Sequence, residues 1–274
     1  MHSNRTLSEK TASVVIWTVT IFVMFYLVVP IFAIVPLSFT SGSLLVFPIP
    51  DLSTRWYRDF ATNPLWTRST MNSLMIASAT TVTATCLGTL AALGLNRASE
   101  RVRRIISALL VLPLIIPVVI TAVAVYYFFS ALALVGTLPG LVLAHTLLAL
   151  PFVVITVSAT LKGFDNNMIR AAASLGAPPL LAFRKVTLPL IFPGILSGAV
   201  FAFATSFDEI VVALFVGSAE LRTLPRQIFS GVTESVTPTI TAAAVVLLTI
   251  SASLMAVVEL LRRRSERLQR ATTT

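Results

Sequence analysis

Two adjacent carboxylates, Asp208 and Glu209, lie inside an otherwise apolar stretch of this 274-residue chain. Residues 201–207 precede them and residues 210–216 follow, and both flanks are rich in large apolar side chains. A charge at the centre of a bilayer costs about 2.5 to 3.5 kcal/mol on insertion scales, so a carboxylate there needs a partner or a water-filled cavity. The pair is therefore the first candidate for chemistry. It would attract a cationic solute, and Phe207 would offer an aromatic face for a cation–π contact.

The residues just before this pair predict a break in the helix that carries it. Ser206 precedes Glu209 by three residues and Thr205 precedes Asp208 by three, which is the spacing of a capping box. Irregular backbone at membrane depth is tolerated only against protein or an aqueous pathway. Two interpretations stay open. In one, a carboxylate caps the restarted helix while the other meets an arginine of a partner subunit; in the other, at least one faces the pathway, because adjacent helical residues point about 100° apart.

Sequence patterns of common enzymes and nucleotide sites are absent from the chain. Lys10, Lys162 and Lys185, its three lysines, lack the preceding glycine of a phosphate-binding P-loop. His2 and His145 are the only histidines, so a His-Glu-x-x-His zinc motif cannot form, and no Gly-x-Ser-x-Gly elbow is present. We therefore predict no enzymatic activity, no catalytic or metal site and no cofactor in this chain. We interpret His145 as a hydrogen-bonded packing residue.

The composition identifies an integral membrane protein. Hydrophobic residues make up 56% of the chain, the mean hydropathy is +0.92, and only 11% of residues are charged, against about 25% in soluble domains. Six apolar stretches are long enough to cross the hydrocarbon core as helices. They are residues 14–35, 71–95, 105–129, 138–161, 190–216 and 239–261. We therefore predict an all-α fold, a polytopic membrane protein with six transmembrane helices in a single domain over residues 1–274.

Prolines inside these stretches predict kinks, because proline removes a backbone donor that neighbouring helices must compensate. Five prolines are expected to bend the spans so that the bundle encloses a cavity: Pro113, Pro117, Pro151, Pro189 and Pro193. The single cysteine, Cys86, excludes an internal disulfide, and its apolar surroundings predict a buried side chain.

The distribution of lysine and arginine predicts the orientation in the membrane, because these residues concentrate in cytoplasmic loops. Fifteen of the twenty fall in the N-terminal segment, the loops 94–104 and 162–189 and the tail 262–274, and five fall in the alternate loops. Both termini are therefore predicted to be cytoplasmic. The net charge of +9 follows from this topology. Since no basic patch is interleaved with surface aromatics, we predict the lipid bilayer, and not nucleic acid, as the partner of these charges.

The loop 162–189 predicts a helix, a sharp turn and a second short helix. Residues 171–175 favour a helix, Gly176 suits a left-handed C-terminal cap, and the prolines at 178 and 179 open a new element. Residues 180–186 would combine apolar side chains with Arg184 and Lys185. We expect such a surface to bind a partner protein.

This loop resembles the EAA loop of binding-protein-dependent ABC importer permeases. Ala171, Ala172, Gly176, Val186 and the Leu188-Pro189 pair match the family's pattern, whereas Arg170 stands where the family has glutamate. The resemblance implies that the loop is the coupling helix seated in a cytoplasmic ATPase subunit. The reversed charge at Arg170 bears on any acidic contact to that ATPase. The implied coupling residues are Arg170, Ala171, Ala172, Leu175, Gly176, Ala177, Phe183, Leu188 and Pro189.

Further segments resemble PotC-type permeases of spermidine/putrescine importers, and together with the loop they cover residues 38–260. These segments are residues 52–57, Phe60, residues 72–74, residues 88–91 and residues 206–209. The resemblance implies a type I ABC importer permease with the MetI-like fold in the bacterial cytoplasmic (inner) membrane. Its cargo would be a small cationic solute, with polyamines (spermidine or putrescine) as first choice, and Phe207, Asp208 and Glu209 would line the pathway.

The same resemblance implies partners and leaves alternatives open. The expected partners are a second permease subunit in a heterodimer, an ABC ATPase dimer that binds ATP-Mg, and an extracytoplasmic solute-binding protein. Whether the second permease is a homologue or another copy stays open. One alternative is an ABC permease for another small solute. An ATP-independent cation transporter is the other, although that class does not explain the loop around Gly176.

Overall fold

The structure, a computed structural model, describes residues 7–163, 167–234 and 236–271. Over these residues it is all-α, as predicted, with one isolated bridge between Thr40 and Leu52. The contacts divide the chain into two compact parts, where the sequence predicts one domain. The first part comprises residues 1–62 and 231–246, and the second comprises residues 63–230 and 247–274. Three parts of the predicted segments lie outside the described residues. They are Arg5 of the N-terminal segment, residues 164–166 of the loop 162–189 and residues 272–274 of the tail.

The first part begins with α1 (Leu7–Ser38) and contains α2 (Arg55–Thr62). The Ser38 hydroxyl lies 2.7 Å from the Tyr57 hydroxyl, and this hydrogen bond ties the end of α1 to α2. The stretch between the first two predicted spans is therefore not a simple loop, because it holds a helix anchored to the first span.

The last helix, α12 (Pro238–Ala271), begins in the first part. Within that part the Thr239 hydroxyl donates a hydrogen bond of 2.7 Å to Asp59 Oδ2 of α2. The helix does not stop at the end of the predicted sixth span, and it continues through most of the basic segment 262–274. The described portion of that segment is therefore helical.

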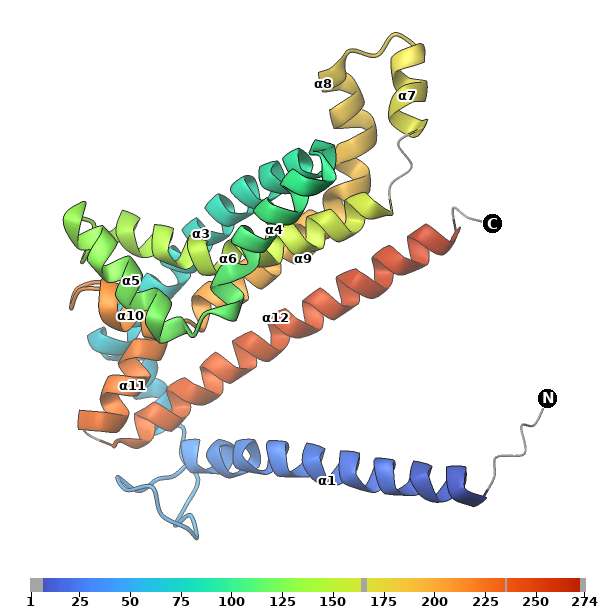
Figure 1. The fold of residues 1–274 in the computed structure, drawn as a ribbon. Coiled ribbons are helices and arrows are strands. Elements are labelled where there is room, and N and C mark those ends of the chain that lie inside the picture. Colours follow the sequence, from blue (N-terminus) through green and yellow to red (C-terminus); the bar gives the residue numbers. More distant parts are fainter. Residues whose placement is uncertain (1–6, 164–166, 235, 272–274) are drawn as a thin grey trace. The chain divides into compact units, whose positions relative to one another are not determined.

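The second part holds a bundle in which α3, α6 and α9 lie side by side, with α7 and α8 at one end and α5 and α10 at the other (Figure 1). From residue 63 to residue 234 the elements are α3 (Pro64–Arg97), α4 (Glu100–Ile115), α5 (Val118–Ala131), α6 (Leu138–Lys162), α7 (Asn167–Ser174), α8 (Pro179–Ala182), the π-helical turn η1 (Phe183–Thr187), α9 (Leu188–Phe207), α10 (Val211–Val216) and α11 (Leu224–Glu234).

Five helices of the described chain are long and apolar enough to cross a membrane, and α4 with α5 makes a sixth if this bent pair is one span. The predicted third span is therefore broken, because α4 and α5 meet at 106°. Pro117 is the residue that precedes α5, and its missing N–H leaves the α4 ladder without a donor at this point. The sequence predicted a kink here, and the structure shows a complete break.

The second span starts earlier than its hydropathy predicts, at Pro64 and not at residue 71. The Asn63 side chain accepts a hydrogen bond from Leu65 N, and Pro64 occupies the first helical turn, where a missing N–H is harmless. A hydropathy criterion misses such a polar first turn. Farther along α3, Cys86 is exposed, so the prediction that it is buried is wrong.

Glycines set the spacing of α3, α6 and α9. Val153 of α6 is fully buried and lies between Gly88 of α3 and Gly198 of α9. A Cβ atom added at Gly88 would lie 2.7 Å from Val153 Cβ. One added at Gly198 would lie 2.6 Å from Thr156 Oγ1 and 3.0 Å from Val153 Cα. Small residues allow this close approach of helix backbones, which is a common source of packing energy in membranes.

We predict that Gly198→Ala destabilises the bundle by about 1 to 3 kcal/mol, because the added methyl group meets backbone atoms of α6 that cannot rotate away. Gly94→Ala is the matched control. A Cβ atom at Gly94 meets nothing within 4 Å, so that substitution should be neutral or slightly stabilising. Thermal unfolding of both purified variants in detergent measures the difference. Equal unfolding temperatures would contradict the packing described for Gly198.

Candidate functional site

The acidic pair lies at a break between two helices of the second part. The helix α9 ends at Phe207 and α10 begins at Val211, so the predicted break is confirmed. Glu209 is buried, and its two carboxylate oxygens accept hydrogen bonds from Val212 N at 2.9 Å and from Ala213 N at 3.0 Å. Glu209 therefore caps the restarted helix with its side chain.

The capping-box explanation of this break is wrong. The residue before α10 is Ile210, and the Ser206 hydroxyl does not cap that helix. Ser206 Oγ lies instead 2.8 Å from Nδ1 of His145, a fully buried residue of α6. The interpretation of His145 as a hydrogen-bonded packing residue is confirmed.

The buried imidazole of His145 also approaches the capping carboxylate. Its Nε2 atom lies 3.7 Å from Glu209 Oε2, which is too long for a hydrogen bond, and has no hydrogen-bond partner among the described residues. Ser206, His145 and Glu209 thus form a polar cluster that joins α6 to the break after α9. No sequence pattern predicts this cluster, because 61 residues separate His145 from Ser206.

The other members of the predicted pathway face different surroundings. Asp208 is exposed, and no hydrogen bond or ion pair of its carboxylate is found within the described part of the chain. Phe207 is only 1% exposed, and its ring stacks on Phe203 with centroids 5.6 Å apart. An open aromatic face at Phe207, as the sequence predicts, is therefore not present in this conformation.

A cavity of about 480 Å³ lies beside the two helix breaks. Residues 113–118 at the junction of α4 and α5 form one side, and Thr205 and Glu209 contribute polar atoms from the other break. Leu148 and Phe152 of α6 complete the lining. The aromatic side chain at this cavity is therefore Phe152. Sequence reasoning missed it, because only the fold brings this part of α6 next to the acidic pair.

The N-terminal half of the predicted coupling loop has the expected geometry. Ala171 and Ala172 lie in α7, and Gly176 follows that helix with φ = +80°, the left-handed conformation that favours glycine. Gly176 N donates to Ala173 O at 2.9 Å, and Ala177 N donates to Ala172 O at 3.0 Å. These bonds satisfy carbonyl groups at the end of α7 and fix a sharp turn.

Beyond the turn, the prediction of a separate second helix is wrong. The helix that begins at Pro179 passes through the π-helical turn η1 and runs on to Phe207 as one apolar helix of 29 residues. Leu188 N donates to Phe183 O, five residues back, directly before Pro189. In an α-helix, Pro189 would leave one hydrogen bond unmade, and its ring would clash with the carbonyl four residues earlier. The wider π turn relieves this clash, so the helix continues through Pro189.

The remaining coupling residues differ in exposure. Leu175 is 88% exposed at the tip of the turn, and Arg170 and Pro189 are also exposed. Phe183 and Leu188 are half-buried, as is Ala177. The exposed members of the predicted coupling set therefore lie on both sides of the turn at Gly176 in the sequence.

The segment 72–74, which the resemblance to PotC-type permeases singled out, has a structural role. Asn72 Nδ2 donates to the carbonyls of Glu220 at 2.9 Å and Arg222 at 3.1 Å, and Ser73 Oγ accepts from Leu224 N at 2.8 Å. This part of α3 therefore holds the connection between α10 and α11, which fixes the far side of the break.

The fold is that of a multi-pass transport permease. The structure resembles a chain of a bacterial ABC transporter involved in the import of the acidic polysaccharide alginate, with a TM-score of 0.69 and 16% identity over 94% of this chain and 98% of that one. Residues 84–267 match the family of binding-protein-dependent transport system inner membrane components, and the chain belongs to this family. It is a multi-pass protein of the cytoplasmic membrane.

Relatives extend this similarity over most of the chain. The spermidine/putrescine transport system permease protein PotC of Haemophilus influenzae (strain ATCC 51907 / DSM 11121 / KW20 / Rd) is 32% identical over 240 residues, which cover 88% of this chain and 93% of that protein. The putrescine transport system permease protein PotI of Escherichia coli (strain K12) is 35% identical over 230 residues, which cover 81% and 82% of the two chains.

The two carboxylates should respond differently to neutralisation. We predict that Glu209→Gln lowers stability by about 1 to 3 kcal/mol, because an amide group cannot accept both backbone hydrogen bonds at the start of α10. Asp208→Asn is the matched control and should leave stability unchanged, since that side chain is exposed. Thermal unfolding of the purified variants checks this. The capping assignment fails if Asp208→Asn is the more destabilising of the two.

Proposed function

We propose that this permease subunit translocates a polyamine, spermidine or putrescine, as part of an ATP-driven importer. The observation that carries the proposal is the exposed carboxylate of Asp208 at a helix break, directly before Glu209, which lines a cavity together with Phe152. The names of the relatives PotC and PotI support the same class of cargo.

The surroundings of the break suit a flexible, multiply charged cation. Glu209 is already engaged by two backbone N–H groups, so Asp208 is the carboxylate free to meet an ammonium group of the solute. The half-buried Phe152 ring stacks on Phe201 with centroids 5.9 Å apart, and the part of the ring that lines the cavity offers an apolar surface for the methylene chain. Pairing a cation with a carboxylate in this low-dielectric setting offsets the cost of removing both from water.

The energy for transport would come from other subunits. We propose that the turn at Gly176, with Leu175 at its tip, seats in an ABC ATPase dimer that binds ATP-Mg, and that a second permease and an extracytoplasmic solute-binding protein complete the importer. ATP binding would close the ATPases and shift the balance between inward-facing and outward-facing states.

The helix that runs from Pro179 to Phe207 supplies a direct mechanical link for this coupling. It starts beside the turn, ends at the acidic break, and spans about 44 Å at 1.5 Å per residue. A displacement of the turn would therefore move the residues that precede Asp208. Because the π-helical turn keeps the helix continuous through Pro189, the displacement is not lost at that proline.

We predict that Asp208→Asn lowers the kcat/KM of polyamine uptake by about tenfold or more, the effect of losing one charge-assisted hydrogen bond. Uptake of labelled spermidine and putrescine by the complete importer in vesicles measures this. Asp51→Asn, which neutralises another exposed carboxylate, is the matched control and should transport normally. Unchanged uptake by both Asp208→Asn and Glu209→Gln would remove the acidic pair from the pathway.

Gly176→Pro should abolish transport while the protein still inserts and folds. Proline is restricted to φ near −65° and lacks the N–H that bonds to Ala173 O, so the turn cannot form. Gly176→Asn is the matched control, because asparagine tolerates the left-handed conformation and should retain most of the uptake. Uptake and solute-stimulated ATP hydrolysis in vesicles are the measurements. A fully active Gly176→Pro importer would contradict the role of this turn.

Co-purification separates this proposal from an ATP-independent cation transporter. A permease of the proposed kind brings an ATPase subunit with it from the membrane, and its transport depends on ATP. An importer of another small solute would retain both properties but would not take up spermidine or putrescine.

A further inference from the structure

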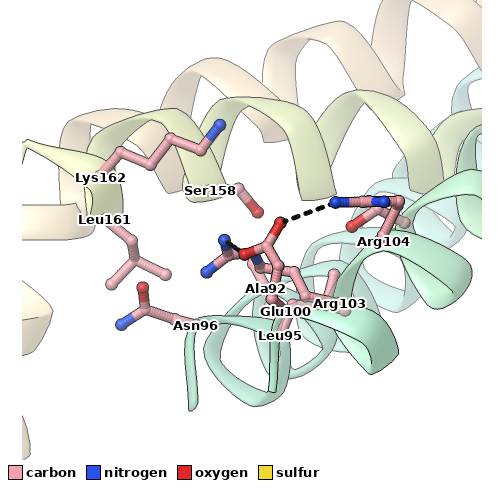
Figure 2. A pocket seen from close by; sticks show the side chains of 10 residues that line it. Ala92, Leu95, Asn96, Glu100, Arg103, Arg104, Ser158, Leu161 and Lys162 are labelled. Atoms are coloured by element: carbon pink, nitrogen blue, oxygen red, sulfur yellow. Dashed lines mark hydrogen bonds and ion pairs between the residues drawn. The ribbon is translucent and has the colours of Figure 1, made fainter. Parts of the chain in front are cut away.

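A second pocket, of about 200 Å³, lies at the end of the bundle where α3 ends and α4 begins (Figure 2). Lys162 and Ser158 of α6 face it from one side, and Asn96 of α3 with Arg103 and Arg104 of α4 face it from the other. Side chains from three helices therefore converge on one small volume.

The pocket is rich in positive charge and in hydrogen-bond donors. Glu100 is the one acidic lining residue; it accepts a hydrogen bond from Arg103 and lies 3.9 Å from Arg104. Lys162 has no ion pair within the described part of the chain. The pocket therefore has three cationic side chains, Arg103, Arg104 and Lys162, and one carboxylate, Glu100. The hydroxyl of Ser158 and the amide of Asn96 add neutral hydrogen-bond donors. This set of groups suits a phosphate anion.

The pocket lies at the depth of lipid headgroups. It forms where α3 ends at Arg97, α4 begins at Glu100 and α6 ends at Lys162, which is the cytoplasmic boundary in the predicted topology. Ala92, Leu95 and Leu161 line the same pocket and add apolar surface beside the charged groups. A ligand with an anionic head and apolar chains matches both surfaces.

We propose that this pocket binds the phosphate group of an anionic phospholipid of the cytoplasmic leaflet. Basic pockets between transmembrane helices on this side of a membrane are suited to such headgroups. The excess of arginine and lysine on the cytoplasmic side does not by itself explain this pocket. That excess would not require cations, hydroxyls and an amide from three helices to line the same pocket. The bound lipid would bridge α4 and α6 at the base of the bundle.

Native mass spectrometry of the full chain, purified in detergent and titrated with phosphatidylglycerol or with phosphatidylethanolamine, tests this. We expect phosphatidylglycerol to bind more tightly, and Lys162→Gln to weaken it about fivefold, the effect of one cation near an anionic headgroup. Arg101→Gln is the matched control: Arg101 is exposed on α4 and does not line the pocket, so binding should change less than twofold. If Lys162→Gln does not fold, Arg104→Gln serves the same purpose.

Four results would overturn the proposal. Equal binding of the two lipids by the unsubstituted chain would remove the preference for an anion. Equal effects of Lys162→Gln and Arg101→Gln would remove the pocket as the site. If inorganic phosphate displaced the lipid and bound as tightly as the lipid does, free phosphate would be the ligand. Loss of ATPase co-purification in Lys162→Gln, with lipid binding unchanged, would instead assign the pocket to an acidic side chain of that partner.

Discussion

A carboxylate within a membrane-spanning segment must be compensated, and the way Glu209 is compensated shapes the centre of this permease. Its two oxygens accept backbone hydrogen bonds from the start of α10, so the interruption after Phe207 leaves fewer unsatisfied groups. His145 and Ser206 add polar atoms to the same spot. With Glu209 occupied in this way, Asp208 remains exposed. We propose that the two neighbouring acids have separate functions: Glu209 stabilises the break, and Asp208 meets the solute.

The rest of the second part holds this break in place. Val153 fits between glycines of α3 and α9, which brings three helix backbones close together and leaves little freedom to shift. The junction of α4 and α5 supplies a second break, and both breaks border the same cavity. Irregular backbone is thus concentrated around one cavity. The unbroken helix from Pro179 to Phe207 connects this region to the turn at Gly176.

The sequence predicts the features that depend on local pattern. The apolar spans follow from hydropathy and the turn at Gly176 from glycine's conformational freedom. The break beside Asp208 was expected from capping-box spacing, and it is present, but the side chain of Glu209 caps α10 in place of Ser206. The sequence-based predictions fail where contacts between residues far apart in the chain determine the structure. Neither the pairing of Ser206 with His145 nor the position of Phe152 at the cavity has a local signature. The continuity of α8 with α9 was missed because proline usually starts or breaks a helix, and here a π turn accommodates Pro189.

The central claim is that Asp208 faces the solute, and chemical accessibility tests it most directly. Replacing the single cysteine by Cys86→Ser and introducing Asp208→Cys gives one reactive thiol in the chain. A membrane-impermeant, cationic thiol reagent applied to the complete importer then reports whether this position opens to water during the transport cycle. Our account predicts labelling that ATP modulates. Spermidine should slow it when its concentration is raised about tenfold to offset the loss of the carboxylate. A thiol that is never labelled, or whose labelling is unaffected by spermidine, would contradict it.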